Sequence, residues 1–205
     1  MSFDSDPIIA QLRKGLLPIE IFDGADAVKR KGQRGASVLM PLVFRHEWQV
    51  ILTQRPQTMP QHPGQIAFPG GKREAGETAL QAALRETDEE IGVSDHDITI
   101  LGRLPSFNAV SEYRVTPFVG IVSPKAKIIP DPREVEDVFE TPLSFLMEPK
   151  NHVPRDVFFE GKNHRLYDMP YNSPDGTHRN IWGMTAMIMY RLYQRSYQAV
   201  FETEY

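Results

Sequence analysis

The sequence predicts an α/β fold, a sandwich built around a mixed β-sheet. Strand-length runs of apolar and β-branched residues occur towards both ends of the 205-residue chain, and helical patterns lie between and after them. This order of strands and helices is typical of a sandwich. Hydrophobic residues make up 40% of the chain and charged residues 24%, which is enough apolar material for a sizeable core.

The first quarter of the chain is predicted to hold a short helix and a hairpin. Residues 5–14 have an amphipathic pattern and are expected to be helical. The apolar runs 36–44 and 48–55 are separated by three polar residues, which predicts two antiparallel strands. We expect residues 1–35 to be an N-terminal extension of helix and loop, and residues 36–205 to be a single domain that includes the C-terminal helix.

The clearest helix follows a segment rich in proline and glycine. Residues 56–76 are expected to lack regular structure. Residues 76–92 form the predicted helix, with Thr78 as a candidate N-cap and Gly92 as its stop. The later predicted elements are strands at 97–104 and 115–123, a strand and short helix within 134–146, a hairpin at 154–169 and a C-terminal helix at 181–201.

Composition excludes several classes of protein. A net charge of −4 argues against a nucleic-acid coat or a basic membrane-surface protein. No apolar run approaches the roughly 18 residues of a membrane helix, and the start lacks the features of a secretory signal. The absence of cysteine removes disulfides, thiolate metal sites and cysteine nucleophiles. We therefore expect a cytoplasmic protein with no nucleic-acid or membrane partner.

The helix at 76–92 gathers acidic residues on one face. At about 100° per residue, Glu86, Glu89 and Glu90 lie together beside Ala79 and Ala82. The residues expected to face the core are Leu80, Leu84, Thr87 and Ile91. Like charges one turn apart, near a helix C-terminus, destabilise a helix by about a few tenths of a kcal/mol. The cluster is explained if a divalent cation such as Mg²⁺ or Mn²⁺ neutralises it; the alternative is a solvated acidic face.

The loop before this helix completes a known pattern. Paired glycines, Gly70 and Gly71, permit a positive φ and close approach of the backbone to a ligand. The stretch 71–93 resembles the Nudix box, in which glycine, glutamate and an Arg-Glu pair recur at fixed spacing. The matching positions are Gly71, Glu77, Arg85, Glu86, Glu89, Glu90, Gly92 and Val93. Thr87 stands at a position that is usually aliphatic.

The resemblance implies a fold, a reaction class and a cofactor. Nudix proteins are α/β/α sandwiches that use Mg²⁺ or Mn²⁺ to hydrolyse a nucleoside diphosphate linked to another group. By position, Glu86, Glu89 and Glu90 would hold the metal, and it stays open which of them accepts a proton from the attacking water. Glu77 and Arg85 would form an ion pair that orients those carboxylates.

The segment ahead of the box resembles the signature of the coenzyme A diphosphatase branch. The matching positions are Ile51, Leu52, Thr53, Arg55, Gly64, Phe68, Pro69, Gly70 and Gly71. Pro56 replaces a small residue, and Pro60 replaces a second arginine whose guanidinium proline cannot imitate. This resemblance implies that coenzyme A, or an acyl or oxidised form of it, is cleaved to 3′,5′-ADP and 4′-phosphopantetheine.

Several features have both a functional and a structural interpretation. Arg55 is either a phosphate contact or a surface ion pair, and His62 either a substrate contact or a polar loop residue. Glu134 is either a further metal ligand or a solvated acid. Gly70 and Gly71 are expected to contact the substrate. The apolar C-terminal helix fits core packing or a homodimer. Two alternative functions are a diphosphatase for ADP-ribose, a dinucleotide or a damaged nucleoside triphosphate, and a protein that binds a nucleotide metabolite without hydrolysis.

Overall fold

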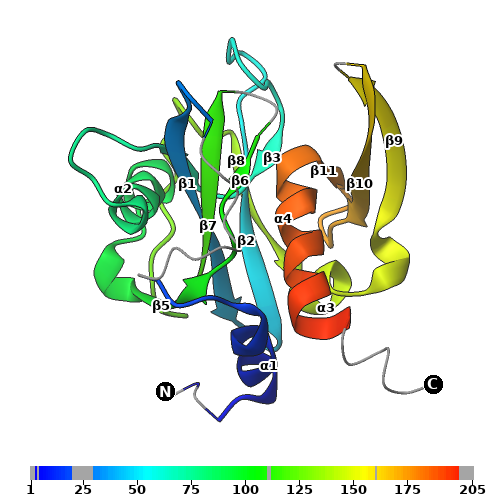
Figure 1. Ribbon diagram of the computed structural model, residues 1–205. Coiled ribbons are helices and arrows are strands. Elements are labelled where there is room, and N and C mark those ends of the chain that lie inside the picture. Colours follow the sequence, from blue (N-terminus) through cyan, green and yellow to red (C-terminus); the bar gives the residue numbers. More distant parts are fainter. Residues whose placement is uncertain (1–2, 4, 20–29, 110–111, 160, 199–205) are drawn as a thin grey trace.

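The computed structural model (Figure 1) describes residues 3, 5–19, 30–109, 112–159 and 161–198. Its larger sheet has the strand order β3-β2-β1-β7-β5. These strands are β1 (Arg34–Phe44), β2 (Trp48–Gln54), β3 (Ile66–Ala67), β5 (Ile98–Arg103) and β7 (Tyr113–Val122). Strands β1 and β7 run parallel and the other neighbours run antiparallel, so the sheet is mixed as predicted.

Further strands extend this sheet or form a second one. β4 (Gly70–Lys72) pairs with β1, β6 (Phe107–Asn108) with β7, and β8 (Asp137–Pro142) with β2. The smaller sheet has the order β11-β10-β9, formed by β9 (Val153–Phe159), β10 (Lys162–Asn172) and β11 (His178–Trp182).

The helices form layers on the larger sheet. Helix α2 (Ala79–Ile91) lies on one face of the sheet, and α4 (Gly183–Tyr193) lies between the sheet and the smaller β9–β11 sheet (Figure 1). The predicted α/β/α sandwich is therefore present, and the smaller sheet adds an outer layer. The remaining helical segments are α1 (Pro7–Gly15), η1 (Asp95–Asp97), α3 (Leu143–Leu146), η2 (Pro149–Asn151) and η3 (Gln194–Gln198). In the described ranges, no helix is long and apolar enough to span a membrane.

Helix α2 begins and ends where the sequence predicts. The Thr78 hydroxyl accepts a hydrogen bond from the Gln81 backbone N–H, and the Gln81 side chain accepts one from the Thr78 N–H, which makes a capping box. Gly92 ends the helix in the left-handed conformation, with φ of 67°. These two caps fix which residues of the acidic segment are helical.

The buried face of α2 matches the predicted one in part. Thr87 and Ile91 have no exposed surface, as predicted, whereas Leu80 and Leu84 are only half-buried. Ala82, Ala83 and Glu90 are buried instead. Ala79 and Ala83 pack on Leu39 and Phe118, and the half-buried Leu80 packs against the same cluster. The helix therefore turns its small residues to the strands together with part of the predicted face. One consequence is that Glu90 is carried into the interior.

Two predicted boundaries are wrong. The 56–76 segment contains the short strands β3 and β4, whose pairing with β2 and β1 depends on distant residues. The C-terminal helix begins at Gly183 and not at 181, because Ile181 and Trp182 pair with β10 as part of β11. Residues 199–201 of the predicted helix lie outside the described residues. The other predicted strands, hairpins and helices are confirmed within a few residues.

Helix α1, in the N-terminal extension, packs into the main core. Ile9 and Leu12 have no exposed surface, and the Arg195 guanidinium on η3 donates to the Gly15 carbonyl at 2.6 Å. The Asp6 carboxylate caps α1 by accepting from the Ile8 and Ile9 N–H groups.

Asp6 also joins this helix to the larger sheet, since its second oxygen accepts from the Trp48 indole at 3.1 Å. We expect Asp6→Ala to lower the free energy of unfolding by about 1–2 kcal/mol, because the variant loses a cap and leaves the indole N–H without its partner. Asp6→Asn keeps a capping oxygen and should lose much less. Chemical denaturation of the two variants measures the difference. Equal stability of Asp6→Ala and the parent chain would contradict the role given to this carboxylate.

Candidate active site

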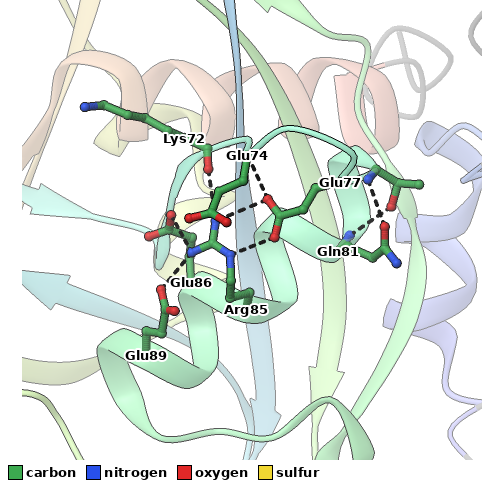
Figure 2. A network of polar contacts seen from close by, with 8 residues as sticks. Lys72, Glu74, Glu77, Gln81, Arg85, Glu86 and Glu89 are labelled. Carbon is green, nitrogen blue, oxygen red and sulfur yellow. Dashed lines mark hydrogen bonds and ion pairs between the residues drawn. The ribbon is translucent and has the colours of Figure 1, made fainter.

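One guanidinium organises the acidic face of α2 (Figure 2). Arg85 Nε donates to Glu77 Oε1 at 2.7 Å, and its Nη1 donates to Glu86 at 3.0 Å and Glu89 at 2.7 Å. Its Nη2 donates to the Lys72 carbonyl at 3.0 Å. Arg85 therefore contacts three carboxylates and the end of β4 at once. The Glu77–Arg85 ion pair expected from the sequence is present, whereas the Lys72 carbonyl was not predicted.

The surroundings change the pKa values of these acids in different directions. Hydrogen bonds from Arg85 and from the Glu74 N–H lower the pKa of Glu77, so this acid stays charged. Burial raises the pKa of Glu86, and the contact with Arg85 opposes that effect. Glu77 is thus a stable anionic partner for Arg85, while Glu86 is the acid whose charge is costly.

Glu90 is the most deeply buried acid of the helix. Its side chain is 4% exposed, and burial raises its pKa to about 8, with the charges of Glu86 and Glu134 adding to the effect. The Arg55 guanidinium and a hydrogen bond from the Gly70 N–H oppose the rise. Glu134, far away in the sequence, is therefore near enough to Glu86 and Glu90 for its charge to raise the pKa of both.

The paired glycines of β4 lie directly against these acids. A Cβ on Gly71 would come within 2.4 Å of the Glu86 carboxylate. A Cβ on Gly70, where φ is 155°, would come within 2.4 Å of the Ser37 carbonyl. Gly70 is closed to any side chain, because backbone atoms of β1 occupy the space, whereas a side chain at Gly71 would require the Glu86 carboxylate to move.

A loop before β8 brings Glu134 to the helix. The Ile129 N–H donates to the Ile91 carbonyl at 2.8 Å, and the Asp131 N–H donates to the Glu90 carbonyl at 3.0 Å. The Glu134 N–H in turn donates to the Asp131 carbonyl at 3.0 Å. The loop therefore satisfies carbonyls at the C-terminal end of α2 and places Glu134 beside it. Asp131 belongs to no sequence motif, so it was not among the predicted site residues.

The structure brings Arg55 to the acids. Arg55 follows β2, and its guanidinium lowers the pKa of Glu90. Its Nε is buried without a hydrogen-bond partner in the described part of the chain. His62 lies exposed further along the same loop with φ of 56°, where its carbonyl accepts from the Gln65 N–H. The described contacts do not connect His62 to the acids.

The donor set fits a divalent cation, although the acids do not form a closed cage. No three acidic or imidazole side chains of the described ranges lie close enough to make a metal centre by themselves. Glu86 and Glu89 are both held by Arg85. Carboxylate oxygens are the ligands that Mg²⁺ and Mn²⁺ prefer. Glu86, Glu90 and Glu134 face one another as like charges, and a cation among them would relieve that repulsion.

Comparisons with known proteins agree on the family. A model of the NUDIX domain matches residues 33–160. The chain is 39% identical to the uncharacterized Nudix hydrolase NudL of Enterobacter sp. strain 638, over 78% of this chain and 81% of that protein. It is 36% identical to NudL of Photorhabdus laumondii, over 79% of this chain and 84% of that protein.

Solved structures with a similar fold are more distant. The Ap4A hydrolase binary complex of C. elegans is 21% identical, covers 54% of this chain and 81% of its own, and has a TM-score of 0.46. The Nudix hydrolase RenU of M. smegmatis is 21% identical, covers 56% of this chain and 74% of its own, and has a TM-score of 0.48. On the match of the domain model and of the NudL proteins, the chain belongs to the Nudix hydrolase family.

Proposed function

We propose that this Nudix hydrolase cleaves the phosphoanhydride of coenzyme A or its derivatives, giving 3′,5′-ADP and 4′-phosphopantetheine or its acyl form. The observation that carries the proposal is the guanidinium of Arg55, whose Nε is buried without a hydrogen-bond partner in the described part of the chain and whose charge lowers the pKa of Glu90. Hydrolysis of a phosphoanhydride needs a metal site and a fixed hydrogen-bond donor for the phosphate oxygens. A guanidinium is well suited to be that donor, because it can donate two parallel hydrogen bonds. The signature at 51–71 supports coenzyme A as the substrate.

Each residue has a distinct part in this mechanism. Glu86, Glu89, Glu90 and Glu134 would hold Mg²⁺ or Mn²⁺, which when bound neutralises phosphate charge and lowers the pKa of a bound water. One of these carboxylates would accept the proton of the attacking water. Arg55 would donate to a phosphate oxygen.

Supporting groups fix the geometry of the site. Arg85 is held by its ion pair with Glu77, and its Nη1 holds Glu86 and Glu89 together. Gly70 and Gly71 would let the backbone approach the substrate, and the lack of a Cβ on Gly71 leaves room for the Glu86 carboxylate.

A substrate panel tests the choice of substrate. Purified protein with Mg²⁺ is expected to convert coenzyme A to 3′,5′-ADP, identified by mass, at a kcat/KM at least about tenfold above that for ADP-ribose, a dinucleotide or an oxidised nucleoside triphosphate. The loss of a second arginine at Pro60 favours the second candidate, ADP-ribose, which has no 3′-phosphate. If AMP from ADP-ribose is the main product, the second candidate is correct. If none of the tested compounds is hydrolysed, the remaining interpretation is a protein that binds a nucleotide metabolite without hydrolysis.

Removing one carboxylate tests the role of the acids. Because Glu90 is buried and its pKa is raised to about 8, Glu90→Gln resembles the protonated form and should fold normally. We expect Glu90→Gln and Glu89→Gln to lower kcat by roughly two orders of magnitude or more, since each removes a charge that holds the metal. Asp88→Asn is the matched control, because Asp88 is exposed on the same helix. Its kcat should stay within about twofold, and near-normal kcat in both glutamate variants would refute the assignment.

The substitution Gly71→Ala tests the metal site by a binding measurement that does not depend on activity. The added methyl of Gly71→Ala would collide with the Glu86 carboxylate, so we expect Mn²⁺ affinity to fall about tenfold. Gly35→Ala on β1 is the control, since its Cβ would meet only the side chain of Arg73 at 3.3 Å. Isothermal titration of the metal-free proteins measures both affinities. Equal Mn²⁺ affinity in the two variants would place the metal away from Glu86.

A further inference from the structure

A buried arginine outside the Nudix box joins the two sheets. Arg179 lies on β11 with 6% of its side chain exposed. Its Nη2 donates to Asp137 Oδ2 at 2.6 Å, and its Nη1 and Nη2 donate to Asp175 at 3.1–3.2 Å. Its guanidinium carbon lies 4.4 Å from the ring centroid of Phe139 on β8. The smaller sheet is thus fixed to the first residue of β8.

That contact point lies next to two residues of the candidate site. Asp137 pairs with Gln54, the last residue of β2, and Arg55 follows directly. The Glu136 N–H donates to the Gln54 carbonyl at 2.8 Å. Glu134 lies three residues before Asp137 on the same loop. A displacement of Asp137 would therefore be passed through the backbone to both Arg55 and Glu134.

The other end of the same loop is held by α2. Asp131 donates its N–H to the Glu90 carbonyl at 3.0 Å, and Val135 donates its own to the Asp131 carbonyl at 2.9 Å. The segment 131–137 thus runs from helix α2 to the end of β2. The Glu90 carbonyl holds its first residue, Asp131, and Arg179 holds its last residue, Asp137. Glu134 lies in the middle of this span.

Stability alone does not require an arginine at this position. Desolvating a guanidinium is costly, and an ion pair of a buried charge is often no more stabilising than well-packed apolar residues of the same volume. Here the guanidinium is the buried partner, since Arg179 is 6% exposed whereas Asp137 and Asp175 are 43% and 54% exposed. Its hydrogen bonds impose one geometry on the segments that they join.

We propose that Arg179 is a positioning residue for the active site: through Asp137 it sets where Glu134 and Arg55 lie relative to the acids of α2. The proposal rests on the function proposed above and adds a determinant from the smaller sheet. Arg179 itself touches neither the substrate nor the metal.

Mn²⁺ binding to the metal-free, full-length protein tests this proposal. We expect Arg179→Met to weaken Mn²⁺ affinity about tenfold, as removal of an outer-shell partner typically does, and to raise the KM for coenzyme A. Arg179→Lys keeps a cation for Asp137 and should recover most of both losses. The control is Arg165→Met on β10, whose ion pair with Asp156 at 3.0 Å is exposed on the same sheet. Mn²⁺ affinity in this control should remain within twofold of the parent.

A folded Arg179→Met variant that binds Mn²⁺ as tightly as the parent would overturn the proposal and leave the proposed function intact. If Arg179→Met does not fold, Asp137→Asn decides in its place, because the Asp137 side chain is 43% exposed and its replacement keeps the shape. The same tenfold loss supports the proposal, and unchanged affinity overturns it. A parent protein that binds no Mn²⁺ and hydrolyses no phosphoanhydride would overturn the proposed function and, with it, the role of Arg179.

Discussion

Repulsion among like charges on helix α2 is the constraint on which the arrangement of this protein depends. Two like charges about 4 Å apart near a protein surface repel by roughly 4 kcal/mol. The chain meets this cost with one guanidinium, since Arg85 contacts Glu77, Glu86 and Glu89 together. Burial and the charges of Glu86 and Glu134 raise the pKa of Glu90 to about 8, so charge on this acid is the most costly of the group. The loop, strand end and glycines around the helix are arranged about this group of charges.

The sequence predicts those parts of the fold that local interactions determine. The caps of α2 at Thr78 and Gly92 depend on residues within one helical turn, and both predictions are correct. Strands β3 and β4 were missed, because two or three residues show no periodicity and exist only through their partners on β2 and β1. The buried face of α2 was predicted only in part for a related reason. Thr87 and Ile91 are buried as predicted, but close packing on the sheet also buries Ala79 and Ala83, which hydrophobicity alone does not select over leucine.

The same division applies to the candidate site. The box identifies the helix acids and Arg85, since their spacing is a property of one helix. Whether Arg55 forms a surface ion pair depends on which residues fold near it, and the sequence does not show that its Nε is buried without a hydrogen-bond partner in the described ranges. Asp131 and Arg179 act through a backbone carbonyl and a buried ion pair with distant residues, so no spacing in the sequence marks them.

The packing of α1 against η3 has a consequence for synthesis of the chain on the ribosome. The Gly15 carbonyl accepts from Arg195, and the Leu12 carbonyl accepts from the Ser196 hydroxyl, so the partners are 180 and 184 positions apart. Helix α1 can pack on the larger sheet as soon as β2 has formed, since Asp6 accepts from Trp48, but its contacts with η3 cannot form until residues 194–198 have been made. Closing this part of the core therefore joins segments about 180 residues apart, and the entropy cost of so long a loop is met only when most of the chain is present.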